Sequence, residues 1–232
     1  MQYTLDTRAE TDDNIKQVQT VVLRMLKYLN KICSDHDISF WLEYGTLLGA
    51  IRHKGFIPWD NEADVGMLRQ DFEKFKSIAQ KELPNDIFFQ TKESDPYYSE
   101  GAVFIEGKLR DKYSNYVNFE KEHPEVKWHN GIQVDIFVYD AYSINDKTYL
   151  INEFERIFTN CKSYFLAEEL EYLEEVDFED TKFLIPTSFD KYLERNYGNY
   201  HELPPEEARI FQYVDVFNHC NHKEVLKWLN KK

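Results

Sequence analysis

Residues Phe40–Met67 form the most informative stretch of the chain, and they read FWLEYGTLLGAIRHKGFIPWDNEADVGM. An apolar segment leads into Gly45-Thr46, and a short apolar helical pattern follows. The stretch ends in acidic residues at a spacing of two, namely Asp60, Glu62 and Asp64. Side chains two positions apart project from the same face of a strand. Carboxylates in such a row repel one another unless a cation lies among them, so the sequence predicts a Mg²⁺ site for phosphoryl chemistry, with Mn²⁺ as the alternative ion.

A second apolar strand supplies a further carboxylate. Residues 131–139 read GIQVDIFVY and place Asp135 between Val134 and Ile136, where a lone charge needs a partner. The alternation of acidic and apolar residues around Asp64 is also typical of the solvated face of a half-exposed strand. Asp135 favours the metal interpretation, because carboxylates from two adjacent strands can bind one or two Mg²⁺ ions.

Composition limits the classes of function. The chain has 232 residues, a formal charge of −14, 42% apolar residues and 16% aromatic residues. This charge argues against general nucleic-acid binding, which depends on Lys and Arg. The three cysteines have no disulfide or zinc spacing and are expected to be reduced thiols. No signal segment or membrane-spanning run is visible, so we expect a soluble cytoplasmic protein, either free or peripherally attached to the inner face of a membrane.

Hydrophobic periodicity predicts an α+β fold, a mixed sheet flanked by helices, in a single domain of residues 1–232. Helices are expected at residues 14–35, 46–52, 71–83 and 188–197, and strands at residues 40–43, 62–68, 86–90, 102–109 and 131–139. Residues 146 to about 173 show a helical, strongly acidic pattern, and a last helix is expected near residues 223–229. We therefore expect an α/β core at about residues 14–145 and a mainly helical C-terminal lobe at about residues 146–232.

The order of these elements resembles the nucleotidyltransferase fold of the polymerase-β type. Gly45-Thr46, a short helix, an acid-x-acid strand and a third acid on a later strand appear in that order. The resemblance implies that Gly45 and Thr46 meet substrate phosphates and that Glu62, Asp64 and Asp135 bind the metal ions. Without it, Gly45 is an ordinary turn glycine and Thr46 a helix cap.

A closer resemblance is to the LicD family of phosphotransferases, which includes the fukutin-related proteins. It is carried by EYGTLLGAIRHKGFIPWD, by the later VDIF, by GKLRD at residues 107–111 and by YGNYHELPPEEAR near the C-terminus. The family stretch WDDDIDV here reads WDNEADV, so that Asn61, Glu62 and Ala63 are the departures. Glutamate can still bind Mg²⁺.

The family resemblance implies transfer of a phospho-alcohol, typically phosphocholine from CDP-choline, to a glycan hydroxyl with release of CMP. The acceptor would be a cell-surface glycan precursor, such as one of lipopolysaccharide or teichoic acid. Some relatives move ribitol phosphate from CDP-ribitol. Two alternatives remain: nucleotidyl transfer to a protein or small molecule, and a catalytically degenerate nucleotide-binding subunit.

The family resemblance also implies roles for individual residues. Glu62 and Asp64 would hold the metal at the diphosphate, while Asp135 would hold a second metal or take the proton from the acceptor hydroxyl. Basic residues would contact the donor diphosphate, and these are Arg52, His53, Lys54, Lys108 and Arg110. A surface charge run and a one-sided basic strand are the alternative readings of these residues. Aromatic candidates for contact with choline are Trp41, Tyr44, Trp59, Tyr113, Tyr116 and Trp128.

Overall fold

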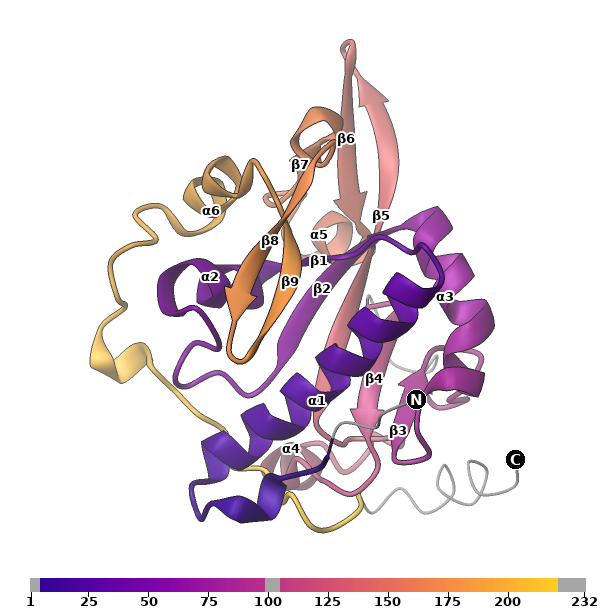
Figure 1. Cartoon of the computed structure of the whole chain (residues 1–232), viewed down its shortest axis with the longest axis vertical. Helices are drawn as coiled ribbons and strands as arrows, with labels where there is room; N and C mark the ends of the chain where they lie inside the picture. The colour runs from indigo at the N-terminus through magenta and orange to yellow at the C-terminus, as the bar shows by residue number, and fades with distance from the viewer. Residues whose placement is uncertain (1–4, 99–104, 221–232) are drawn as a thin grey trace.

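The computed structural model describes residues 5–98 and 105–220. In these ranges the chain folds into one mixed seven-stranded sheet, a separate two-stranded sheet and flanking helices. The predicted α+β class with a mixed sheet flanked by helices is therefore confirmed. Figure 1 shows helices α1 and α3 packed beside the main sheet and a long β5–β6 hairpin that extends away from it.

The main sheet has the strand order β1-β2-β5-β4-β3, and β6 and β7 continue it from β5. Strands β2 and β5 run parallel, whereas β1–β2, β5–β4 and β4–β3 are antiparallel. Strand β5 is therefore the centre of the sheet. The bounds are Trp41–Leu42 (β1), Ala63–Leu68 (β2), Ile87–Gln90 (β3), Gly107–Asp111 (β4) and Gln133–Ile144 (β5).

Two amphipathic helices cover one face of this sheet. Helix α1 (Asn14–Asp35) contacts β4 and β5, and α3 (Arg69–Glu82) contacts β2, β3 and β5. Val134 and Ile136 of β5 are fully buried. Because side chains alternate along a strand, Gln133 and Asp135 project from the opposite face. The fold therefore separates an apolar face from a polar one on the same strand.

Helix α2 (Tyr44–His53) follows β1 closely, and residues 54–62 connect it to β2. Lys54 caps its C-terminal end with a left-handed backbone, φ 57°. A Cβ atom built on Gly49 would lie 2.5 Å from the carbonyl oxygen of Gly55. Glycine at this position therefore allows the chain to pass close to the helix and enter β2 beside it.

The expectation of a mainly helical C-terminal third is wrong for the described residues. The region contains four strands as well as short helices, and the strands are β6 (Lys147–Asn152), β7 (Phe165–Leu166), β8 (Leu173–Phe178) and β9 (Thr181–Pro186). Its helices are α5 (Glu153–Phe158) and α6 (Phe189–Tyr197), of which α6 matches the predicted helix at residues 188–197. The helix expected at residues 223–229 lies outside the described residues.

A hairpin turn explains the error. Asn145 and Asp146 both have positive φ, 48° and 61°, and connect β5 to β6. Two left-handed residues form the turn that suits the twist of an antiparallel hairpin, and Asn and Asp tolerate this conformation. Pairing with β5 outweighs the helical spacing of the apolar residues that follow. Strand β5 consequently runs on to Ile144, well past the predicted end at Tyr139.

The described helices include none with the combined length and apolar character that crossing a membrane requires. The remaining short helices are α4 (Val117–Glu122) and the 3-10 turns η1 (Arg8–Glu10), η2 (Ala167–Glu169) and η3 (Glu206–Ala208).

Candidate active site

Two rows of polar side chains cross the sheet on the face opposite α1 and α3. In the first row, strand register places Asp64 of β2 beside Asp135 of β5, and Asp135 beside Lys108 of β4. The row ends at Gln90 of β3, which pairs with Lys108. Directly opposed residues in neighbouring strands share a face of the sheet. The face therefore changes from acidic at β2 to basic at β4.

The second row lies one step along the strands. Gln133 of β5 is paired with Arg110 of β4, and its side-chain amide donates a hydrogen bond to Glu62 Oε2 at 2.5 Å. Glu62 immediately precedes β2. The structure thus brings Glu62, Asp64 and Asp135 together with Lys108 and Arg110, all of which the sequence singled out.

Lys108 and Asp135 form a buried ion pair. The lysine Nζ lies 2.7 Å from Asp135 Oδ1 and 2.8 Å from Oδ2, and it also donates to Gln133 Oε1 at 3.3 Å. The side chains are 10% and 5% exposed. Burial lowers the pKa of Lys108, and the Asp135 charge opposes this effect.

The acids at the β2 edge have no such partner. Asp60, Glu62 and Asp64 are half-buried, and none of them forms an ion pair with any residue that the structure describes. Burial followed by the charge of Glu62 raises the pKa of Asp60 to about 7. Burial and then the neighbouring carboxylates Glu62 and Asp135 raise the pKa of Asp64. The β2 edge therefore gathers carboxylates that lack an ionic partner, and such a cluster favours the binding of a cation.

The N-terminal end of α2 fixes the backbone of this edge. The Asp64 amide donates to Thr46 Oγ1 at 2.8 Å, and the Asp64 carbonyl accepts from the Glu43 amide at 2.9 Å. A Cβ atom on Gly45 would approach Asp60 Oδ2 to 3.2 Å. Gly45 and Thr46 thus lie against the acids, and Thr46 already uses its hydroxyl oxygen as an acceptor for β2.

A pocket of about 630 Å³ opens beside the two rows. Its apolar walls are formed by Tyr98, Ile105, Tyr116, Phe119, Trp128, Phe154, Phe158 and Ile210. Its polar lining consists of Asn61, Glu62, Lys108, Arg110, Asn130, Gln133 and Gln212. Asp64 and Asp135 do not line the pocket themselves, but their neighbours Glu62 and Lys108 do. Of the six aromatic candidates chosen from the sequence, Tyr116 and Trp128 line it.

Arg110 is held in the pocket wall by neutral groups. Its Nε donates to Gln90 Oε1 and one terminal nitrogen donates to the Gly131 carbonyl, both at 2.8 Å. Gln90 is itself fully buried and donates to Asp95 and to the His129 carbonyl. Among the described residues, no carboxylate forms an ion pair with Arg110. The pocket therefore contains a positive charge, only 4% exposed, that suits an anionic group.

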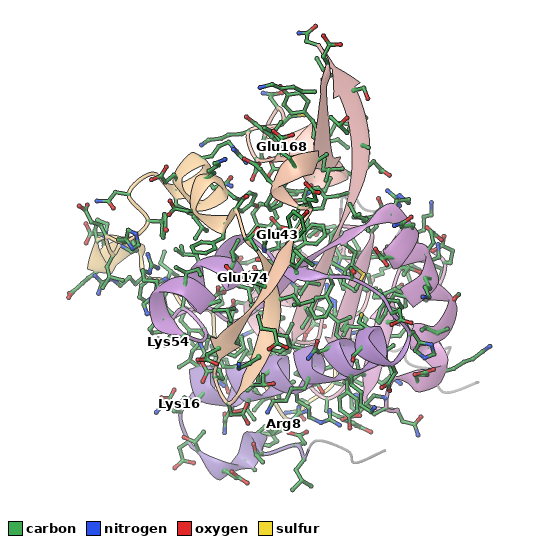
Figure 2. The ribbon with its side chains drawn as sticks, turned by 45° about the horizontal axis from the view of Figure 1, so that its top comes forward. Arg8, Lys16, Glu43, Lys54, Glu168 and Glu174 are labelled. Atoms are coloured by element: carbon green, nitrogen blue, oxygen red, sulfur yellow. The ribbon has the colours of Figure 1, made fainter. Side chains whose placement is uncertain are left out.

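The basic residues of the predicted loop lie elsewhere. Arg52 and His53 belong to the last turn of α2, and Arg52 donates to the carbonyls of Tyr200 and Glu202. Lys54 is exposed near the outer edge of the molecule, whereas Glu43 lies at its middle (Figure 2). These three basic residues do not line the pocket.

The donor set suits Mg²⁺ or Mn²⁺ but is not a preformed three-acid site. Carboxylate oxygens are the ligands that these ions prefer, and the mutual repulsion of Glu62 and Asp64 would be relieved by a divalent cation. Within residues 5–98 and 105–220, however, no group of three or more His, Cys, Asp or Glu side chains is arranged to hold a metal. In place of a metal, Asp135 has Lys108 as its ionic partner.

Several residues of the site were not predicted from the sequence. Gln133 could have been found, because it lies two positions before Asp135 and must share its face. Gln90 and the pocket residues Phe154 and Phe158 could not, because they depend on strand order and on α5, a helix that follows an unexpected strand.

Comparisons with known proteins identify the family. Residues 37–188 match the family described as LicD/FKTN/FKRP, nucleotidyltransferase domain. The lipopolysaccharide cholinephosphotransferase LicD of Haemophilus influenzae is 26% identical, over 83% of this chain and 93% of its own length. The mouse ribitol-5-phosphate transferase FKTN is also 26% identical, over 83% of this chain but 36% of its own length. The human ribitol 5-phosphate transferase FKRP is 40% identical over 45 residues, which is 19% of this chain.

The family match covers more than half of the chain and includes both acidic strands and the basic strand β4 between residues 37 and 188. The mixed sheet flanked by helices is consistent with a nucleotidyltransferase-like fold. The phosphotransferase relatives support a transferase activity. The chain belongs to the LicD family.

Proposed function

We propose that this protein transfers a phospho-alcohol, with phosphocholine as the first candidate, from a CDP-activated donor to a hydroxyl of a cell-surface glycan or teichoic-acid precursor. CMP is the leaving group. The observation that carries the proposal is the gradient of charge from Glu62 and Asp64 to Arg110, next to a pocket large enough for a nucleotide. The acidic end suits a divalent cation, and the basic end suits phosphate.

The residues of the two rows have separate roles in this reaction. Glu62 and Asp64 hold the divalent ion, which when bound offsets charge on the diphosphate. Arg110 binds a diphosphate oxygen from the pocket wall, and its neutral partners leave its charge for the ligand. Gln133 orients Glu62 through its amide, while Asp135 holds Lys108 in place. Positioning and charge stabilisation account for the acceleration in such a displacement.

Choline is favoured among transferred alcohols by the aromatic walls of the pocket. A quaternary ammonium binds well on aromatic faces, and Tyr116 and Trp128 are among the aromatic residues that line the pocket. The relatives named above include both a cholinephosphotransferase and ribitol-phosphate transferases, so a comparison of CDP-choline with CDP-ribitol tests this choice directly.

The experiment is incubation of the purified chain with Mg²⁺ and a panel of CDP-alcohols, in the presence and absence of glycan acceptors, with CMP and the labelled glycan both measured. We expect CMP release and phosphocholine on the glycan. Asp64→Asn removes a proposed metal ligand with little change in size, and a fall of about a hundredfold or more in rate is expected. Asp177→Asn, on exposed strand β8, is the matched control and should retain full rate.

The remaining functions give different results in the same assay. Attachment of the CMP moiety to the acceptor would identify a nucleotidyltransferase. Binding of CDP-choline or CMP without turnover under any condition would identify a degenerate binding subunit. Full activity of Asp64→Asn would contradict the proposed metal site.

A further inference from the structure

Lys108 places an ammonium group beside Asp135 in the candidate active site. Its ammonium contacts both oxygens of Asp135 and also the side chain of Gln133, and the register of β4 and β5 holds it directly beside the carboxylate. The ion pair is buried at both ends. Displacement of the lysine would leave an unpaired ammonium in the protein interior, which is strongly unfavourable.

We propose that the site takes a single divalent ion at the β2 edge, on Glu62 and Asp64, and that Lys108 serves as the second cation by neutralising Asp135. This inference rests on the proposed function, since it assigns how the metal-dependent site divides its positive charge. It removes the ambiguity over Asp135, which then acts as the anchor of Lys108 and not as the ligand of a second metal.

The balance of charge supports one ion. The ionised carboxylates Asp60, Glu62, Asp64 and Asp135 together carry four negative charges, and the neighbouring cations Lys108 and Arg110 offset two of them. The two charges that remain match one divalent cation. A second divalent ion would leave this cluster with excess positive charge in partly buried surroundings, which is costly.

The contacts of each carboxylate support the same division. Both oxygens of Asp135 accept from Lys108, and Oδ2 also lies 3.4 Å from the Gln133 amide. Glu62 accepts only the Gln133 amide through Oε2, and Asp64 has no side-chain hydrogen bond to any residue that the structure describes. The oxygens available to a metal are therefore those of the β2 edge.

The test is the number of Mn²⁺ ions bound per chain, measured by electron paramagnetic resonance with the metal alone. The wild-type chain should bind one ion, because Lys108 excludes a second. Lys108→Gln releases Asp135 from its ion pair, so this variant should bind two Mn²⁺ ions per chain. Lys112→Gln is the matched control, because the side chain of Lys112 donates to the Asn85 carbonyl and forms no ion pair with the proposed metal ligands, and it should bind one ion.

Two further variants keep the test decisive if Lys108→Gln does not fold. Lys108→Arg retains the positive charge and should bind one ion. Asp135→Asn should also bind one, with an affinity within about threefold of wild type, whereas Asp64→Asn should weaken binding by about tenfold or more.

Two ions bound to the wild-type chain would overturn the inference and leave the proposed function intact. So would an unchanged count of one in folded Lys108→Gln, or a loss of the bound ion in Asp135→Asn. Binding of no Mn²⁺ by the wild type would contradict the metal site of the proposed function itself, and this inference with it.

Discussion

Glu43 is a single buried carboxyl group that should make the free energy of unfolding depend on pH. It lies fully buried directly before α2, where it accepts hydrogen bonds from the Trp41 indole at 2.5 Å and from the Tyr192 hydroxyl. Burial, only partly offset by these hydrogen bonds, raises the pKa of Glu43 to about 7 from an ordinary value of 4.5. The folded state therefore favours the protonated form of this side chain.

Glu43 should make the protein less stable as the pH rises from about 4.5 to 7. The unfolded chain releases the proton near 4.5, but the folded chain retains it up to about 7. The stability that Glu43 contributes is thus complete below 4.5, is lost through this window and is constant above it. Glu43→Gln imitates the protonated form. Relative to wild type, its free energy of unfolding should rise by about 3 kcal/mol across the window.

Urea unfolding at a series of pH values measures this difference. Glu174→Gln, on the exposed strand β8, is the matched control and should follow the wild-type curve. A constant difference between Glu43→Gln and wild type from pH 4.5 to 8 would show that the carboxyl group does not titrate in this range.

Gln90 supports Arg110 without touching the pocket itself. The side chain is fully buried and bridges Arg110 Nε to Asp95. Gln90→Met keeps the size but leaves both groups without this partner, so the free energy of unfolding should fall by about 1–3 kcal/mol. Because Arg110 would also lose its fixed orientation, the dissociation constant for CMP should rise by about fivefold or more.

Calorimetric titration of CMP and urea unfolding give the two values for Gln90→Met. Gln80→Met changes an exposed glutamine and should alter neither. A loss of stability with unchanged CMP binding would assign Gln90 a purely structural role.

Thr46 links two secondary-structure elements, because its side chain joins α2 to β2 by a hydrogen bond. It is 3% exposed, and its hydroxyl oxygen accepts the Asp64 amide hydrogen. Thr46→Val preserves the shape and leaves that amide without its acceptor, so we expect a loss of about 1–3 kcal/mol in the free energy of unfolding. Thr46→Ser retains the hydroxyl and should lose much less.

The same pair of variants separates a structural role for Thr46 from the phosphate contact implied by the family resemblance. If Thr46 has only a structural role, the affinity of folded Thr46→Val for CMP should fall only together with its free energy of unfolding, because both changes come from the displaced Asp64 backbone. A tenfold weaker affinity without loss of stability would instead indicate a direct contact between Thr46 and the substrate.

Most elements of the N-terminal two thirds were predictable because local sequence and tertiary packing agree there. Helix α1 has the predicted bounds, Asn14–Asp35, and its apolar stripe packs on the sheet. The long β5–β6 hairpin was not predicted, because its apolar spacing fits a helix and only the turn at Asn145-Asp146 indicates otherwise. Element type was thus determined locally in α1 and by strand pairing in β6.

For the candidate site too, some features could be predicted from the sequence and others depend on how the whole molecule folds. Acidic residues at a spacing of two and the lone Asp135 could be recognised from the sequence, since each belongs to one strand. The Lys108–Asp135 pair and the support of Arg110 by Gln90 could not, because both require the strand order β5-β4-β3. The sequence therefore indicates which groups carry charge, whereas the topology determines which of them neutralise each other.

Hydrogen bonds join a segment near the start of the described chain to one near its end, beside the pocket. After α6 the chain returns toward the N-terminus, so that Asn14 exchanges hydrogen bonds with Val214. Arg8, at the lower edge of Figure 2, donates to Asp111 at 2.8 and 3.0 Å and to the Val216 carbonyl at 2.8 Å. The segment held in this way carries Ile210 and Gln212, which line the pocket.

Loss of Arg8 should therefore lower both the free energy of unfolding and the affinity of the pocket for CMP. Asp111 is fully buried, so Arg8→Met leaves its charge without this ionic partner, and the free energy of unfolding should fall by about 3–5 kcal/mol. The double variant Arg8→Met/Asp111→Asn removes both charges and should recover part of this loss, whereas Lys16→Met, at an exposed position, should cost little. Urea unfolding measures the stabilities, and CMP titration of the folded variants measures the pocket. Equal stability of Arg8→Met and wild type would show that the buried pair does not hold the returning segment in solution.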